Sequence, residues 1–158
     1  MNATIQNHLA SRSLEVRPAS DNDVVTYWSK ALRAFEDARQ VSTSLEGRLL
    51  RAYDAGRLAA LALIRAAGYR PRGSERHHYV TFDAARSIAS TRELADALLG
   101  IDELRSVRHA LEYEPEDDMD AETVARAIET GGRVINLGAK HLRAARPAAA
   151  KRIHLVKP

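Results

Sequence analysis

An ionisable cluster interrupts an apolar stripe around residue 108. Ile101, Leu104, Arg108 and Leu111 follow one another at steps of three, four and three residues, the spacing of one helical face. The Arg108 guanidinium therefore falls on the apolar side of its helix. A charge without a partner is costly there, so Arg108 must reach a partner, water or the rim of a cleft. Glu112, four residues further on, can supply a structural ion pair.

The neighbouring row of the same helix adds Arg105, His109 and Tyr113 at successive steps of four residues. An ionisable cluster of this kind is a candidate functional site, and arginine can fork onto two oxygens of a phosphate. The alternative is structural: a satisfied Arg108–Glu112 pair beside a histidine that stacks on a tyrosine at a helix end. The spacing leaves both interpretations open.

A second cluster lies in the segment YRPRGSERHH, residues 69–78, whose proline and glycine predict a loop. Its candidate phosphate-binding residues are Arg70, Arg72, Arg76, His77 and His78. Neighbouring cations depress the pKa of an imidazole and leave a neutral base. The histidines serve catalysis only if they converge with Arg108; otherwise one caps the following helix and the other packs on a tyrosine. No third ligand stands at metal-binding spacing, so neither a metal site nor a cofactor is expected.

The remaining pattern is helical. Two capping boxes, Thr43 with Glu46 and Ser90 with Glu93, are typical of helix starts, while Gly68 and Pro115 mark helix ends. We expect an all-α fold, an up-and-down bundle of about four long helices with an extra short helix. The expected long helices span 21–40, 43–67, 90–114 and 121–142, and the short one spans 79–89. The pair Gly131–Gly132 inside the last helix indicates close helix approach or a kink.

These elements divide the chain of 158 residues into three parts: a flexible N-terminal arm (1–20), the bundle (21–142) and a basic C-terminal tail (143–158). The tail carries five cations and no acid, which suits contact with nucleic acid. The chain has a net charge of +3 and no cysteine, which excludes disulfides and thiol chemistry. It contains no run of about 20 apolar residues and no secretory signal pattern, so we expect a cytoplasmic protein without membrane contact.

The string LRSVRHALEY, residues 104–113, resembles the signature helix of HEPN domains, which are helical bundles of prokaryotic toxin–antitoxin and defence systems. The HEPN motif is an arginine, a polar residue and, after four to six intervening residues, a histidine. The string RLLRAYDA at 48–55, followed by GYR at 68–70 and RHHY at 76–79, is similar to a bacterial HEPN branch. The resemblance covers roughly residues 24–142.

Carried over to this sequence, the resemblance gives Arg108 the role of the motif arginine and His109 that of the polar residue. Tyr113 stands where the motif has its histidine. Active HEPN proteins cleave RNA without a metal at a dimer cleft, where the arginine stabilises charge and the histidine moves a proton. Tyrosine, with an ordinary pKa near 10, is a poor base at neutral pH.

The departure at Tyr113 favours a non-catalytic or degenerate module that binds nucleotide or RNA. The resemblance implies a homodimer of a toxin–antitoxin or defence system, acting with a minimal nucleotidyltransferase partner. Two alternatives stay open. One is a metal-independent endoribonuclease toxin that uses Arg108, and the other is a helical bundle that only binds a protein.

Overall fold

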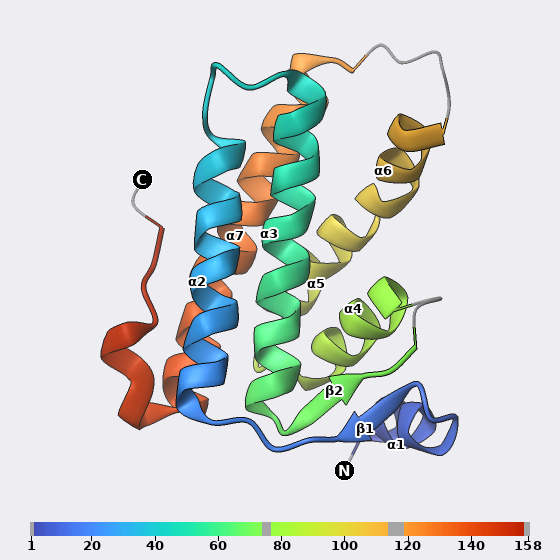
Figure 1. The fold of residues 1–158 in the computed structure, drawn as a ribbon, viewed down its shortest axis with the longest axis vertical. Coiled ribbons are helices and arrows are strands. Elements are labelled where there is room, and N and C mark those ends of the chain that lie inside the picture. Colours follow the sequence, from blue (N-terminus) through green and yellow to red (C-terminus); the bar gives the residue numbers. More distant parts are fainter. Residues whose placement is uncertain (1, 74–76, 114–118, 157–158) are drawn as a thin grey trace.

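The computed structural model describes residues 2–73, 77–113 and 119–156 (Figure 1). This part of the chain contains seven α-helices, one 3-10 helix and two short strands. In chain order they are α1 (Ala3–Ala10), β1 (Leu14–Val16), α2 (Asp21–Ala38), α3 (Leu45–Ala66), β2 (Tyr69–Pro71), α4 (His77–Ile88), α5 (Arg92–Asp102), α6 (Leu104–Tyr113), α7 (Ala121–Ala145) and the 3-10 helix Pro147–Arg152.

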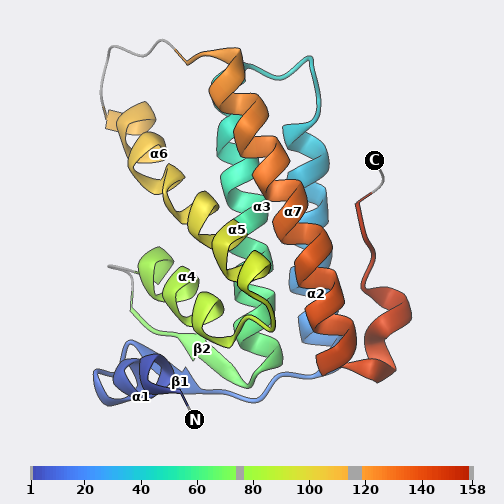
Figure 2. The same cartoon turned by 180° about the vertical axis from the view of Figure 1, so that it is seen from behind.

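The architecture is the predicted all-α bundle, and α3 is its central helix. It contacts α2, α4, α5, α6 and α7, and its buried side chains are mostly alanine and leucine (Figures 1 and 2). Small side chains let the neighbouring helices approach α3 closely. The short helix α4 crosses the lower half of the bundle beside α3, while α6 diverges from α3 toward the top of Figure 1. No helix in the described ranges is both long enough and apolar enough to cross a bilayer.

The helix starts are set by side-chain caps. Ser20 and Asp23 form a reciprocal capping box at the start of α2. At α3 and α5 the cap lies one residue later than predicted: Ser44 accepts a hydrogen bond from the Gly47 amide, and Thr91 accepts one from the Leu94 amide. In both cases the predicted cap residue is followed directly by a second hydroxyl residue. The hydroxyl of that second residue accepts the hydrogen bond from the unpaired amide in the first turn of the helix.

The expected third long helix is divided in two, because α5 ends at Asp102 and α6 begins at Leu104. The Ser106 hydroxyl donates to the Glu103 carbonyl at 3.4 Å, and such a side-chain bond competes with the helical backbone bond. The two halves also differ in burial. Four side chains of α5 are buried, whereas the apolar stripe of α6 (Leu104, Val107 and Leu111) is half-buried.

The prediction of a flexible arm over residues 1–20 is wrong. These residues form α1, which contacts α4, and β1, which pairs antiparallel with β2 so that Glu15 lies opposite Arg70. Ile5 and Leu14 are almost completely buried. Two isolated apolar residues give no periodic pattern in the sequence, but burial against α4 and β2 is enough to order the segment.

The tail is ordered as well. Helix α7 continues to Ala145, three residues past its predicted end, and the 3-10 helix follows at once. Ala149 and Ile153 are buried against the bundle. The short helix after the basic loop begins at His77, two residues earlier than predicted, which places both histidines of the loop on α4.

Two glycines let large side chains of other helices pack against the backbone. A Cβ atom on Gly56 would lie 2.5 Å from Ile101 Cγ2, so α5 can pack on α3 only because this position has no side chain. On α7, a Cβ atom on Gly131 would lie 3.5 Å from the Phe35 ring, which is an ordinary contact distance. Gly131 and Gly132 therefore mark a close approach of α7 to α2, as the sequence indicated.

These distances predict opposite effects of two glycine substitutions. Gly56→Ala should lower the free energy of unfolding by about 1–3 kcal/mol, because Ile101 must move from its fully buried position. Gly131→Ala should leave it unchanged or raise it by up to about 1 kcal/mol through helix propensity. Urea denaturation of both variants measures the difference. Equal destabilisation by the two changes would contradict the close α3–α5 contact.

Candidate functional site

Three helices bring candidate residues together. Tyr53 and Arg57 stand one turn apart on α3, His77 and His78 occupy the first turn of α4, and α6 carries the predicted arginines. We call Tyr53, Arg57, His77, His78, Arg105 and Arg108 the α3–α4–α6 cluster. Helical periodicity fixes which side chains face inward on each helix, and packing of α4 and α6 on α3 makes them meet.

Tyr53 is the centre of this cluster. Its side chain is completely buried, and its hydroxyl oxygen lies 3.0 Å from His78 Nδ1, within hydrogen-bond distance. The guanidinium carbon of Arg108 lies 5.5 Å from the centroid of the Tyr53 ring, a cation–π distance. His78 and Arg108, thirty residues apart in the sequence, thus contact the same side chain. A catalytic role of the loop histidines requires that they converge with Arg108, and His78 does so within one chain.

The cluster is cationic, and its histidines are neutral at pH 7. Burial, together with the charges of Arg57, Arg108 and His77, lowers the pKa of His78 to about 4, while Asp54 opposes them. Burial and Arg57 also lower the pKa of His77. Burial raises the pKa of Tyr53 to about 12, so the phenol stays protonated. Arginine charge is therefore placed beside uncharged hydrogen-bonding groups, an arrangement that suits an anion.

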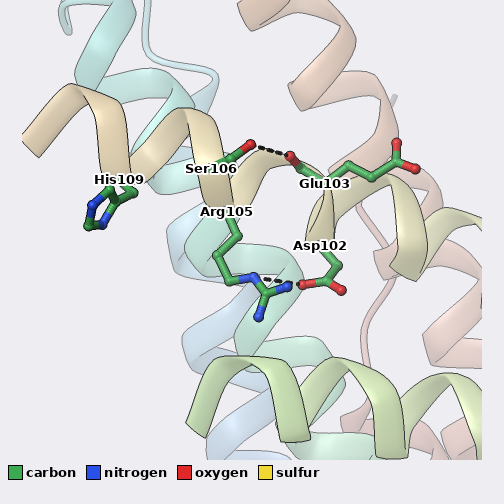
Figure 3. A pocket seen from close by; sticks show the side chains of 5 residues that line it. All are labelled: Asp102, Glu103, Arg105, Ser106 and His109. Atoms are coloured by element: carbon green, nitrogen blue, oxygen red, sulfur yellow. Dashed lines mark hydrogen bonds and ion pairs between the residues drawn. The ribbon is translucent and has the colours of Figure 1, made fainter. Parts of the chain in front are cut away.

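An open depression of about 540 Å³ lies beside the cluster, at the junction of α5 and α6 (Figure 3). It is lined by Asp102, Glu103, Arg105, Ser106 and His109. Arg105 Nε lies 3.2 Å from Asp102 Oδ1, and the Arg105 guanidinium carbon lies 5.5 Å from the centroid of the Tyr79 ring. Burial raises the pKa of the Asp102 carboxyl group. Because the Arg105 side chain is 40% exposed, it is reachable from the depression.

The predicted catalytic set of Arg108, His109 and Tyr113 does not gather at one point. Arg108 is half-buried and turned toward Tyr53, whereas His109 is exposed and Tyr113 is 71% exposed. The His109 and Tyr113 rings instead contact each other, with centroids 4.7 Å apart. This is the histidine–tyrosine stack that the structural interpretation expected. Consecutive helical residues point about 100° apart, so Arg108 and His109 face different surroundings.

The predicted phosphate-binding loop is divided between two places. Arg70 lies 2.7 Å from Glu15, and Arg72 lies 3.4 Å from the same carboxylate, so both arginines are paired at the small sheet. His77 and His78 belong to the α3–α4–α6 cluster. Arg76 lies outside the described residues, and the Glu112 side chain does too, so the predicted Arg108–Glu112 pair stays a prediction.

The sequence pattern does not single out four residues that the structure places at the site: Tyr53, Arg57, Tyr79 and Asp102. Tyr53 lies among the apolar residues of α3, a position typical of a core side chain. The spacing of Tyr53 and Arg57, four residues on one helix, was the available indication. Among the described residues, no group of three histidine, aspartate or glutamate side chains is placed to hold a metal ion.

No protein-family model, curated protein or solved structure matches this chain. The chemistry of the site therefore rests on the geometry of the α3–α4–α6 cluster.

The pKa of His78 predicts a pH dependence of stability. The folded-state value of about 4 lies below the ordinary value of 6.5, so the unfolded chain binds more protons between these limits. The free energy of unfolding should fall as the pH drops from 6.5 to 4. In His78→Asn, whose amide can still reach Tyr53, this fall should be smaller. The control is His154→Asn, at an exposed histidine outside the cluster. Urea denaturation across this range measures both, and identical profiles for the wild type and His78→Asn would contradict the assignment.

Proposed function

We propose that this chain is a HEPN-like helical module that binds the phosphate of nucleotides or RNA at the α3–α4–α6 cluster and does not cleave RNA itself. The observation that carries the proposal is the meeting of His78 and Arg108 on Tyr53. An arginine charge, a neutral imidazole and a phenol together offer several donors to phosphate oxygens.

We propose binding without cleavage because the pKa values of His78 and Tyr53 do not suit a general base at neutral pH. A general base works best when its pKa lies near the operating pH. The pKa of His78 is about 4 and that of Tyr53 is about 12, so both lie far from 7. Tyr113, at the position of the motif histidine, points into solvent and stacks on His109. Neither the His78–Tyr53 pair nor the motif position thus supplies an efficient base at neutral pH.

The exposed His109–Tyr113 pair extends the proposal from phosphate to nucleotide. Single-stranded RNA is recognised largely by stacking of bases on aromatic side chains beside cations. His109 lines the same depression as Arg105, so a base stacked on this pair would place its phosphate near the arginines of α6. A short single strand fits this combination better than a duplex, whose bases are already stacked.

The HEPN resemblance extends the proposal to assembly. We propose a cytoplasmic homodimer of a toxin–antitoxin or defence system, acting with a minimal nucleotidyltransferase. The stripe of α6, formed by Leu104, Val107 and Leu111, packs on the core of its own chain but stays only half-buried, and a second protomer would cover the apolar surface that remains accessible. A two-fold axis there would bring two copies of the cluster side by side.

Removing the α6 arginines tests RNA binding. We expect Arg105→Gln with Arg108→Gln to weaken binding of a labelled single-stranded RNA at least tenfold, since each charged hydrogen bond contributes about 1.5–3 kcal/mol. Fluorescence anisotropy measures the change. The control, Arg92→Gln with Arg126→Gln, removes the same charge from exposed arginines of α5 and α7. Equal binding by the two double variants would contradict a specific site.

The second candidate function is a metal-independent endoribonuclease, favoured by the neutral His78 beside Arg108. A bound phosphate would raise the pKa of His78 toward neutrality. Denaturing gels of RNA incubated with the protein and a metal chelator distinguish the two functions. RNA cleavage that His78→Asn abolishes would replace the binding-only proposal, whereas intact bound RNA supports it. Failure to bind either RNA or nucleotide would favour the protein-binding bundle.

A further inference from the structure

A second basic surface lies on the side of the molecule opposite α6. The C-terminal segment runs along the outer side of α2 and α7 in Figure 1, away from α6, and Figure 2 shows the same separation from behind. The sequence contains no aspartate or glutamate after Glu129. The 29 residues after Glu129 therefore carry basic side chains and no acidic ones.

The C-terminal segment is fixed in place by four hydrogen bonds to the bundle. The Trp28 indole N–H donates to the His154 carbonyl at 2.9 Å, and Arg143 Nε donates to the Ile153 carbonyl at 2.9 Å. The Val156 amide donates to Asn136 Oδ1, and Arg152 donates to Asn22 Oδ1. With Ile153 completely buried, the segment is a folded part of the surface.

These contacts identify the cations that flank the segment. Asn136 shares its face of α7 with Arg133 and Lys140, which stand three residues before and four residues after it. On α2, steps of four, three and four residues lead from Asn22 to Arg33, so these two residues lie on the same face of the helix. We call Arg33, Arg133, Lys140, Lys151 and Arg152 the basic strip; all five are exposed.

The charges of the basic strip are not neutralised within the described residues. Arg33, Arg133, Lys140 and Lys151 form no ion pair with any described carboxylate. This separates them from the structural arginines beside them: Arg143 caps a carbonyl, and Arg146 is paired with Asp21 at 2.8 Å. The acidic residues nearest to these two helical rows are Asp21 and Asp23 at the start of α2, Glu36 and Asp37 one turn after Arg33, and Glu129 one turn before Arg133.

We propose that the basic strip binds the phosphate backbone of a nucleic-acid duplex without reading its sequence. Arg133 and Lys140 are about 10 Å apart along the axis of α7, by the rise of 1.5 Å per residue, so successive cations can reach different phosphates. The described part of the strip carries no exposed aromatic side chain, since Trp28 is buried, and so offers nothing on which an unpaired base could stack. Backbone contacts of this kind give affinity without specificity.

A duplex fits this surface better than a membrane does. Binding at a lipid interface requires an amphipathic face with large apolar side chains beside the cations. Leu155, which is 43% exposed, is the large exposed apolar residue of the described C-terminal segment. The strip lies apart from the α3–α4–α6 cluster, and this proposal does not depend on RNA binding there.

The experiment compares two triple variants of the full chain. The strip variant is Arg133→Gln, Lys140→Gln, Lys151→Gln, and its control is Arg12→Gln, Arg17→Gln, Arg92→Gln, which removes the same charge from exposed arginines outside α7 and the C-terminal segment. Binding of a short labelled duplex is followed by anisotropy as salt rises from about 50 to about 200 mM. The strip variant should bind at least tenfold more weakly at low salt, and the slope of log affinity against log salt should fall by about 2–3, near 0.9 per lost phosphate contact. Circular dichroism checks that both variants fold.

Three outcomes would overturn the proposal: no duplex binding by the wild type at low salt, equal loss in both triple variants, or binding to phosphatidylserine vesicles in place of duplex. The variant Arg105→Gln with Arg108→Gln separates this proposal from the previous one. It should bind duplex as the wild type does, because its substitutions lie on the other side of the molecule. Loss of single-strand binding with duplex binding intact would show that the two surfaces act independently.

Discussion

The contact of Tyr53 with two other helices is the interaction on which the site depends. A buried phenol needs a hydrogen-bond partner, because an unsatisfied polar group in the core costs about 1–3 kcal/mol. His78 lies within hydrogen-bond distance of that hydroxyl, and Arg108 covers the face of the ring. Satisfying one buried tyrosine therefore fixes the first turn of α4 and the middle of α6 against α3. Partial burial of His78 at this contact, together with the neighbouring cations, lowers its pKa and keeps its imidazole neutral.

The rest of the bundle makes this contact possible. Helix α3 is lined with alanine, and Gly56 lets Ile101 of α5 approach its backbone. Helix α5 thus holds the base of α6 firmly, while α6 itself keeps a half-buried apolar stripe. Helix α4 is held from its other side by α1, which the His8–Asp83 pair, 2.7 Å apart, ties to it. The N-terminal segment therefore supports the site although it contributes no side chain to the cluster.

Much of this could be predicted from the sequence, because it depends on local periodicity. The apolar rows located the long helices, and the step from Leu104 to Arg108 placed a guanidinium on an apolar face. The convergence of His78 with Arg108 depends on how helices distant in the sequence cross, which periodicity does not encode. The order of residues 1–20 was missed for a related reason: Ile5 and Leu14 are single apolar residues whose burial depends on α4 and β2. The break at Glu103 falls within a continuous apolar stripe, so the periodicity predicts one helix across it.

The central claim is that phosphate enters the α3–α4–α6 cluster beside His78 and Arg108. The most direct measurement is a titration of the isotope-labelled protein with adenosine monophosphate, following the histidine ring resonances by NMR at several pH values. We expect the His78 ring signals to shift with ligand and the pKa of His78 to rise from about 4, because the anion offsets the charge of Arg57 and Arg108. Unchanged His78 signals, with shifts confined to histidines outside the cluster such as His154, would contradict it.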